Sequence, residues 1–274
     1  MKAADVSVEN FPDFGEAPGT PMASRKWMLE AWETCDGGEI AGALCSTCRG
    51  PNFMDWKKRI TRLYLNAEDR EIGRAFEGKM KEPTWLAGRV AAKDAVRLLV
   101  KNRTGRDIAP TEIVVQNDSH GKPGAGGTWA PALAEPLQLS ISHIKDFALA
   151  VASAKAGFLG LGVDVCPVRE RGKPFIREAF DVTEVALLSR FDEEHRKEWV
   201  TRFWCGKEAA SKALGRGFMY GPKSLRVMEF DEKNETVTVA TAGKLSKAVG
   251  SLSLKAFTEY EEGCIFCVSC LEAE

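Results

Sequence analysis

One short segment of the chain carries charged residues that could bind a phosphate group. In WCGKEAASK, residues 204–212, Glu208 and Lys212 stand four residues apart, so they share one face of a helix. The pair is either an ordinary surface ion pair or half of a phosphate site, in which the carboxylate holds a metal ion and the ammonium neutralises an oxygen. Spacing alone favours the ion pair, so the choice depends on what lies beside this helix.

A further acidic residue stands on a predicted strand. In GFLGLGVDVC, residues 157–166, the apolar side chains alternate, which predicts that Asp164 and Cys166 share the opposite face of the strand. Carboxylates are hard oxygen ligands of the kind that Mg²⁺ prefers. Asp164 and Glu208 therefore form a candidate metal site if the strand and the helix lie side by side; otherwise Asp164 only ends a strand.

Three other polar residues stand at turns. LQLSISHIKDFALAVAS, residues 137–153, has the alternation typical of a β-hairpin, and Ser142 and His143 close its first strand. A histidine at that place bonds to the turn, which is the commoner case, or donates to a phosphate. The segment HGKPG, residues 120–124, predicts a turn that carries Lys122.

Basic residues recur in two other segments. The helix predicted over residues 83–102 bears a cation at every fourth position. These residues are Arg89, Lys93, Arg97 and Lys101. The row is typical of a solvated helix surface, and the alternative is a row of cations for a polyanion. Residues 168–177 form a second basic cluster, which is a solvated loop or a docking site for an acidic partner.

Composition excludes several classes of protein. The chain has 274 residues, 44% of them hydrophobic, and a formal net charge of −1 from 38 basic and 39 acidic side chains. This balance favours neither nucleic acid nor a membrane surface as a partner. No apolar run reaches the roughly 18 residues of a membrane span, and the N-terminus lacks the pattern of a signal peptide. We therefore expect a cytoplasmic protein.

The eight cysteines raise the question of zinc. Cys45 and Cys48 form a CxxC, but a structural zinc site needs four ligands in paired clusters. The C-terminal cysteines stand in GCIFCVSC, residues 263–270, which reads better as a buried apolar strand. Reduced, mostly buried thiols are the preferred interpretation, and a zinc-dependent interaction protein remains an alternative.

Patterning divides the chain into three segments. Residues 1–55 are rich in Gly and Pro, with one short helical candidate over 25–32, and we interpret them as an N-terminal extension. The strongly patterned remainder divides into a first α+β half, residues 56–156, and a second α+β half, residues 157–274. The second half contains a helix over 198–215, ended by Gly215, followed by C-terminal strands.

A faint internal repeat supports this division. WLAGRVAAK, residues 85–93, and WCGKEAASK each run from Trp to Lys over the same span, 119 residues apart. Leu137 and Leu252, which open the following L-x-L strands, are 115 residues apart. Two related halves are therefore expected, with a site at the seam between them.

The motifs together resemble those of the 4'-phosphopantetheinyl transferase superfamily, in its larger, surfactin-synthetase-activating type. The family pattern is a GKP loop, a strand ending in S-x-S-H, then G-[VI]-D, and finally W-x-x-K-E-x-x-x-K. The chain carries GKP, SISH, GVDV and WCGKEAASK in that order, within residues 121–212. The resemblance spans residues 56–274, and it implies an α/β (α+β) fold of two pseudo-symmetric halves behind an N-terminal extension.

The resemblance also implies a reaction, in which the phosphopantetheine arm of coenzyme A passes to a serine of an acyl or peptidyl carrier protein and adenosine 3',5'-bisphosphate is released. Each site residue would then have a role, carried over by position. Asp164 and Glu208 would hold Mg²⁺, Glu208 would help to deprotonate the serine, Lys212 would offset phosphate charge, His143 would contact the 3'-phosphate, and Ser142, Lys122, Lys93 and Arg89 would line the coenzyme A site.

One departure from the family pattern keeps an alternative open. Many members have a second acid two residues after the strand aspartate, where this chain has Cys166, and a thiol is a poor ligand for Mg²⁺. The alternative is a non-catalytic module that binds coenzyme A or a carrier protein. The resemblance favours a monomer, and the extension also allows one domain of a larger multienzyme.

Overall fold

The alternating strand predicted over residues 157–166 is β6 (Phe158–Pro167), at the centre of the molecule. Alternate residues in the middle of this strand pack into a core between two sheets in the computed structural model, which describes residues 40–272, while Leu159 near its start is exposed. The packed residues are Leu161, Val163 and Val165. Asp164 and Cys166 therefore face the other way, as the alternation predicts.

Strand β6 is one edge of a five-stranded antiparallel sheet of order β6-β10-β9-β8-β7. Its other strands are β7 (Leu225–Asp231), β8 (Thr236–Thr241), β9 (Ser253–Glu261) and β10 (Cys264–Glu272). The segment GCIFCVSC forms most of β10 and is largely buried, so the predicted apolar strand is confirmed. Helix α7 (Glu193–Ala213) packs across the outer face of this sheet.

A three-stranded antiparallel sheet of order β1-β5-β4 forms the first half. Its strands are β1 (Ile40–Ser46), β4 (Gln138–His143) and β5 (Phe147–Ser153). Strands β4 and β5 are the predicted hairpin, and helix α4 (Glu82–Thr104) covers this sheet. Helix α4 confirms the helix predicted over 83–102 and ends at Gly105, which has a positive φ of 71°.

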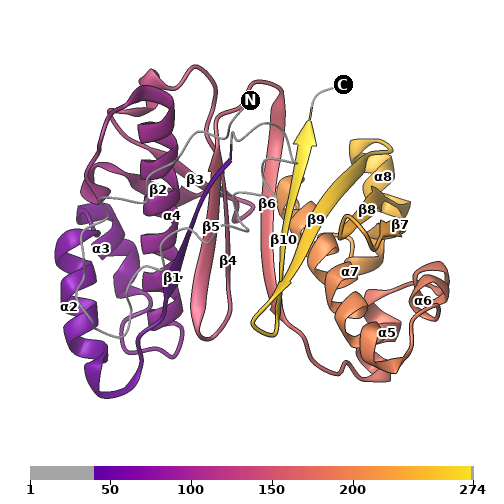
Figure 1. Ribbon diagram of the computed structural model, residues 1–274. Coiled ribbons are helices and arrows are strands. Elements are labelled where there is room, and N and C mark those ends of the chain that lie inside the picture. Colours follow the sequence, from indigo (N-terminus) through magenta and orange to yellow (C-terminus); the bar gives the residue numbers. More distant parts are fainter. Residues whose placement is uncertain (1–39, 273–274) are drawn as a thin grey trace.

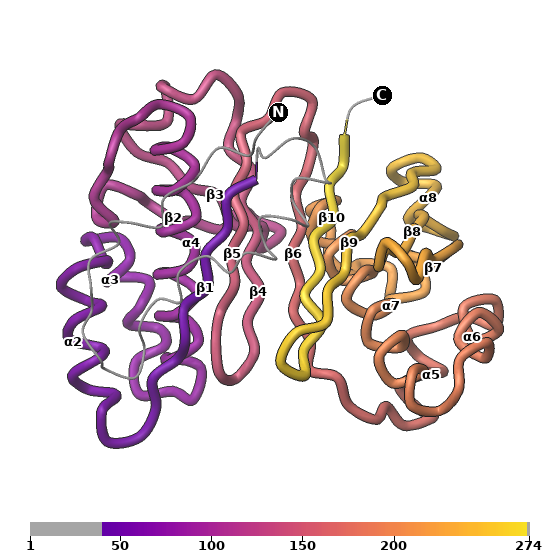
Figure 2. Tube along the Cα trace, viewed as in Figure 1, coloured from indigo at the N-terminus to yellow at the C-terminus, as the bar shows by residue number. Residues whose placement is uncertain are grey.

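The two sheets pack face to face, with one long helix on the outside of each (Figures 1 and 2). Separate apolar cores lie between α4 and its sheet, between α7 and its sheet, and between the two sheets. The mixed α/β fold expected from the sequence is therefore confirmed. Within the described residues, no helix combines the length and apolar composition that a membrane span requires.

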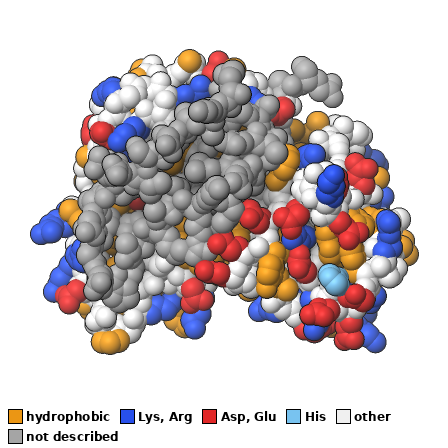
Figure 3. Space-filling view, in the orientation of Figure 1, with side chains coloured by type: hydrophobic (Ala, Val, Ile, Leu, Met, Phe, Trp, Pro, Cys, Tyr) orange, Lys and Arg blue, Asp and Glu red, His pale blue; other side chains and the backbone are white. Residues whose placement is uncertain are grey.

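Smaller elements complete each half. The helices are α2 (Phe53–Leu63), α3 (Ala67–Arg74), α5 (Lys173–Ala179), α6 (Val182–Leu188) and α8 (Gly243–Val249). Strands β2 (Val114–Asn117) and β3 (Pro123–Gly126) form a hairpin, and short 3₁₀ turns are η1 (Gly50–Asn52), η2 (Pro110–Glu112), η3 (Ala130–Ala132) and η4 (Pro222–Ser224). Basic and acidic side chains lie side by side on the face of the second half in Figure 3.

The two halves repeat one order of elements. Each half begins with a strand, which is followed by two short helices, a long helix and two β-hairpins. The last strand of the second hairpin pairs with the strand that begins the half. Strand β1 thus corresponds to β6, α4 to α7, and the β4–β5 hairpin to β9–β10. Helix α8 is an insertion in the second half.

The predicted N-terminal extension includes part of this repeat. Residues 1–39, with the helix predicted over 25–32, lie outside the described residues. Strand β1, however, pairs with β5 along its whole length, so the first half begins before residue 56. Small residues dominate its sequence, IAGALCS, and they give little of the β-branched and aromatic signal by which strands are recognised.

Buried ion pairs show how the two halves align. Lys93 donates to the carboxylate of Asp69 and to the carbonyl oxygen two residues before the N-cap of α3. Lys207 donates to the carboxylate of Glu184 and to the carbonyl oxygen two residues before the N-cap of α6. Each acid is the third residue of a helix that begins with a capping box. Lys93 and Lys207 therefore occupy corresponding positions.

This correspondence corrects the predicted alignment of the repeat. The Trp-to-Lys match places Lys93 opposite Lys212, whereas the structure pairs Lys93 with Lys207, 114 residues further along the chain. The same spacing pairs Glu208 with Asp94, which is buried and bonded to a tyrosine and an arginine of the first half. The first-half counterpart of Glu208 is therefore enclosed.

Candidate functional site

The carboxylate of Asp164, at the seam between the halves, is the centre of the candidate site. Its Oδ1 accepts hydrogen bonds from Ser142 Oγ and from Lys212 Nζ, each at 2.8 Å. Lys212 Nζ also donates to the carbonyl oxygen of Val163 at 2.8 Å. Three residues predicted separately, from β4, β6 and α7, are thus in direct contact.

The serines of SISH explain how the two sheets meet at this point. Ser140 Oγ accepts from the amide of Val163 at 3.0 Å, and Ser142 Oγ accepts from the amide of Val165 at 3.3 Å. These amides belong to the edge strand β6, on the side where it has no strand partner within its own sheet. The serine hydroxyls of β4 thus accept the hydrogen bonds that a neighbouring strand would otherwise accept from β6, and they join the first half to the strand that carries Asp164.

Close backbone contact sets the position of α7 over β6. A Cβ atom added to Gly162 would lie 1.9 Å from the carbonyl oxygen of Ala209, and one added to Gly160 would lie 1.9 Å from that of Ala213. Only glycine allows this approach. It brings the helix face that carries Glu208 and Lys212 onto the strand.

Glu208 is half-buried on α7, and its carboxyl group has a pKa raised to about 7. Desolvation is the largest cause, the negative charge of Asp164 adds to it, and the positive charge of Lys212 opposes it. The ammonium of Lys212 pairs with Asp164 rather than forming the surface ion pair with Glu208 that spacing alone favoured. Two carboxyl groups therefore act on each other across the helix–strand contact.

His143 ends β4 beside these groups. Its side chain is exposed, yet partial desolvation and the positive charge of Lys212 hold its pKa below the ordinary value, while the charge of Asp164 opposes the shift. The ring therefore lies close enough to Lys212 and Asp164 to sense both charges. A neutral imidazole at this edge can donate one hydrogen bond to an anion.

Two cysteines complete the surroundings of Asp164. Cys205 Sγ donates to Asp164 Oδ2 at 3.3 Å, and a guanidinium nitrogen of Arg171 donates to Cys166 Sγ at 2.9 Å. Cys205 was not singled out from the sequence, although it stands three residues before Glu208 and thus on the same helix face. Cys166 is buried, and it stands where the family pattern often has a second acidic residue.

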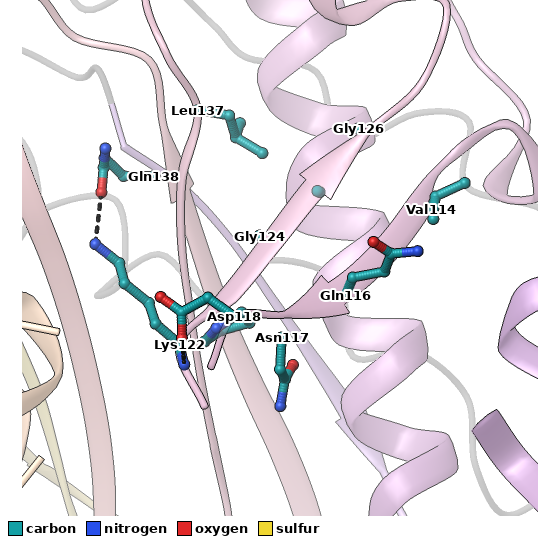
Figure 4. Close-up of a pocket in the computed structure, with 11 residues that line it drawn as sticks. Val114, Gln116, Asn117, Asp118, Lys122, Gly124, Gly126, Leu137 and Gln138 are labelled. Atoms are coloured by element: carbon teal, nitrogen blue, oxygen red, sulfur yellow. Dashed lines mark hydrogen bonds between the residues drawn. The ribbon is translucent and has the colours of Figure 1, made fainter. Parts of the chain in front are cut away.

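A pocket of about 500 Å³ opens in the first half, between the β2–β3 hairpin and the residues that lead into β4 (Figure 4). Lys122 lines it and donates to Gln138 Oε1 at 2.9 Å. Partial burial lowers the pKa of Lys122, and Asp118 opposes that shift. A Cβ atom on Gly215, just beyond α7, would lie 3.3 Å from Lys122 Cδ, so this lysine also contacts the second half.

Arg89 and Lys93 do not belong to this site, contrary to the sequence-based expectation. The ammonium of Lys93 is fully buried, and its three donors are directed at Asp69, Tyr64 and Pro110. Arg89 is also buried, donates to the carbonyl oxygen of Val115 and packs over a tryptophan ring. Arg89 and Lys93 are therefore internal structural residues, whereas Arg97 is partly exposed and Lys101, at the end of the row, is exposed.

The donor set at the seam fits a hard divalent cation in part. Asp164 and Glu208 offer carboxylate oxygens, and desolvation together with the negative charge of Asp164 raises the pKa of Glu208. Across residues 40–272, no group of three or more His, Cys, Asp or Glu side chains is arranged to hold a metal. Any further ligands must come from water or from a substrate.

The sequence of this chain is similar to known proteins of one family. The family model of the 4'-phosphopantetheinyl transferase superfamily matches residues 160–262. Holo-[acyl-carrier-protein] synthases from Bacillus thuringiensis (strain Al Hakam) and Bacillus cereus (strain AH820) are each 31% identical over 98 residues, which is 36% of this chain and 78% of the relative.

Among solved structures, a holo-(acyl-carrier-protein) synthase from Bacillus anthracis str. Ames in complex with CoA (3',5'-ADP) is 24% identical, with a TM-score of 0.34. The match covers 42% of this chain and 92% of that one. The holo-ACP-synthase from Plasmodium yoelii is 18% identical, covering 43% and 97% of the respective chains, with a TM-score of 0.34. The sequence similarity to the Bacillus enzymes establishes that this chain belongs to the 4'-phosphopantetheinyl transferase superfamily.

Proposed function

We propose that this enzyme transfers the 4'-phosphopantetheine arm of coenzyme A to a serine of an acyl or peptidyl carrier protein of a polyketide, fatty-acid or peptide synthase. The observation that carries the proposal is the ion pair of Asp164 and Lys212 at the seam, with Glu208 one helical turn before Lys212 and close enough for both charges to shift its pKa. Two carboxylates and an ammonium offer what a pyrophosphate needs, which is a cation site and a counter-charge. The relatives, which are holo-acyl-carrier-protein synthases, support the same reaction.

The chemistry follows from these side chains. The serine Oγ attacks the phosphorus atom that carries the pantetheine arm, the bond to the bridging pyrophosphate oxygen breaks, and adenosine 3',5'-bisphosphate leaves with the electron pair. Glu208 takes the serine proton, directly or through a water molecule, as a general base held beside the reacting phosphate. Lys212 offsets the charge on the phosphate oxygens, for which it exchanges its contact with Asp164.

Magnesium would be held by Asp164 and Glu208, with waters and the pyrophosphate completing its coordination. When bound, it would supply Lewis-acid stabilisation of charge on the phosphate oxygens. The hydrogen bond from Cys205 and the buried setting of Asp164 keep this carboxylate in place. Cys166 stays bonded to Arg171 and contributes no ligand to Mg²⁺ in this proposal.

The nucleotide end of coenzyme A would lie on the first half. His143 stands beside Lys212 and would donate to the 3'-phosphate. The pocket next to Lys122 has the volume of a small-ligand site, and Lys122 would exchange Gln138 for a phosphate oxygen. Ser142 would support this end indirectly, because it ties β4 to Asp164.

A carrier protein would dock beside α7. Arg169, Lys173 and Arg177 are exposed in and before α5, and Val182 on α6 is 82% exposed. The ring of Phe175 lies 5.0 Å from that of Trp204, so α5 is packed against the catalytic helix. An acidic carrier surface with an apolar centre would complement this face. Because one chain contains both halves, we further propose the surfactin-type class and a monomer. We also propose a cytoplasmic location.

The test is mass spectrometry of apo carrier proteins incubated with coenzyme A, Mg²⁺ and the enzyme. We expect a mass gain of one phosphopantetheine on at least one carrier, accompanied by adenosine 3',5'-bisphosphate. No mass gain on any of several acyl and peptidyl carriers would overturn the proposed function. If calorimetry then shows coenzyme A binding without turnover, the chain is the non-catalytic binding module that Cys166 leaves as the alternative.

A further inference from the structure

The lysine before the catalytic glutamate is completely enclosed. Lys207 and Glu184 have side chains with no exposed area, and Lys207 Nζ lies 2.9 Å from Glu184 Oε1 and 3.1 Å from Oε2. The same Nζ donates to the carbonyl oxygen of Ala179 at 2.6 Å and lies 5.1 Å from the centre of the ring of Phe180. Lys207 therefore has no surface through which to touch a substrate.

Glu184 joins this lysine to two other parts of the second half. Its Oε1 accepts from the amide of Val227, at the start of the sheet, and its Oε2 accepts from the amide of Asp181, which caps α6. The pair Lys207–Glu184, with these bonds, is called the second-half clasp below. It fixes α7 to α6 and to β7 at a point inside the protein.

Burying an ion pair does not by itself stabilise a fold, because desolvation offsets most of the attraction. Such a pair does fix the relative orientation of the two helices that carry it, because its hydrogen bonds are satisfied in only one arrangement. Lys207 precedes Glu208, and successive residues of an α-helix point about 100° apart. Fixing Lys207 toward α6 therefore sets the rotation of α7 that points Glu208 toward Asp164.

We propose that Lys207 is a positioning residue, which acts with Glu184 to aim the Glu208 carboxylate at Asp164, and that it contacts neither coenzyme A nor the carrier. This inference rests on the proposed function of Glu208. Lys207 thus orients the site without touching a substrate, whereas Lys212 of the same helix lies in the site and binds the phosphate.

The first half contains a matched control. Lys93 and Asp69 form the same arrangement, with side chains at 0% and 1% exposure, at the same place relative to a capping box. The residue that follows Lys93 is Asp94, which is enclosed and does not take part in the proposed chemistry. Loss of either lysine should thus cost similar stability, but only loss of Lys207 should misplace a reacting carboxylate.

The experiment compares Lys207→Met with Lys93→Met in carrier modification, at a temperature where melting curves show both variants fully folded. We expect both to lower Tm, Lys207→Met to lower kcat at least about tenfold with KM for coenzyme A nearly unchanged, and Lys93→Met to keep kcat within about twofold. The double variant Lys207→Met/Glu184→Gln should recover part of the lost Tm but not kcat, because it removes the unpaired buried carboxylate and keeps an oxygen that accepts from a backbone amide, while the bond that orients residue 207 stays absent. Equal losses of kcat in the two single variants, or a rise in KM alone for Lys207→Met, would overturn the inference.

A second measurement separates this inference from the proposed function. Hydrogen exchange followed by mass spectrometry should show faster exchange around residues 205–212 in Lys207→Met and unchanged exchange there in Lys93→Met. If wild-type enzyme modifies no carrier, the proposed function fails while this readout still tests the clasp. Unchanged exchange over 205–212 in a folded Lys207→Met variant contradicts a positioning role. If Lys207→Met cannot be purified in a folded form, the double variant takes its place, and unchanged exchange in the double variant contradicts the role in the same way.

Discussion

Lys212 Nζ lies 2.8 Å from Asp164 Oδ1, so the cation of the catalytic helix pairs with a strand carboxylate and not with Glu208 on its own helix. Asp164 has its negative charge compensated, while Glu208 keeps a raised pKa. The two carboxyl groups of the site thereby differ: Asp164 is held by the ammonium of Lys212, whereas Glu208 can take up a proton near pH 7. This difference underlies the predictions that follow.

Replacing Ser142 with Ala should slow transfer by about tenfold, since it removes the hydrogen bond to Asp164 and the acceptor for the Val165 amide. Ser140→Ala is the matched control, because Ser140 accepts only the neighbouring amide of Val163 and does not contact Asp164. Steady-state kcat and melting temperatures measure both effects. If the two variants lose kcat equally and are equally destabilised, the hydrogen bond from Ser142 to Asp164 has no specific role in transfer.

Replacing Gly162 with Ala should destabilise the second half by about 1–3 kcal/mol or prevent folding, because the new Cβ would meet the Ala209 carbonyl oxygen at 1.9 Å. Gly126→Ala is the control, since nothing lies within 4 Å of its added Cβ. Urea unfolding of the two variants gives the free energies of unfolding. A Gly162→Ala variant as stable as the control would show that α7 does not lie against β6 as described.

Binding of Mg²⁺ should release a proton from Glu208. With a carboxyl pKa of about 7 in the free protein, Glu208 is mostly protonated at pH 6 and mostly ionised at pH 8. A metal binds the ionised form, so affinity should rise with pH up to about pH 7 and then level off. Calorimetry at pH 6 in two buffers of different ionisation enthalpy measures the release. Absence of proton release, or its persistence in Glu208→Gln, would argue against this carboxylate as the ligand.

Replacing Lys122 with Ala should raise KM for coenzyme A by about tenfold or more, the cost of losing one charge-assisted hydrogen bond, with kcat little changed. Lys233→Ala, in the exposed turn after β7, is the control for a general loss of one positive charge. Initial rates over a range of coenzyme A concentrations measure both constants. An unchanged KM in Lys122→Ala would remove the pocket from the coenzyme A site.

Local patterns carried most of what could be predicted. Alternation in β6 placed Asp164 on the helix-facing side, and i,i+4 spacing placed Glu208 with Lys212. The contact that joins them is not a local property, because it depends on how closely Gly162 lets the helix approach. Cys205 was missed although its spacing from Glu208 places it on the same helix face, because its contact with Asp164 depends on the same close approach.

The expectations that were wrong depended on contacts between segments far apart in the chain. A basic row every four residues looks the same in sequence whether it faces solvent or an acid buried elsewhere, and Lys93 faces Asp69 from 24 residues away. The repeat was misaligned because a Trp and a Lys were matched by type, whereas the structure matches Lys93 and Lys207 by the capping boxes they contact. Strand β1 was assigned to the extension because its small residues give a weak strand signal in the sequence, although it pairs with β5.

The most direct test of the account is the mass of a carrier protein after incubation with coenzyme A, Mg²⁺ and either wild-type enzyme, Glu208→Gln or Glu193→Gln. Glu193 stands exposed in the first turn of the same helix and controls for the loss of one carboxylate from α7. We predict one added phosphopantetheine with wild-type enzyme and Glu193→Gln, and unmodified carrier with folded Glu208→Gln. Wild-type rates in Glu208→Gln would contradict the central claim that this residue, at the seam beside Asp164, carries the transfer.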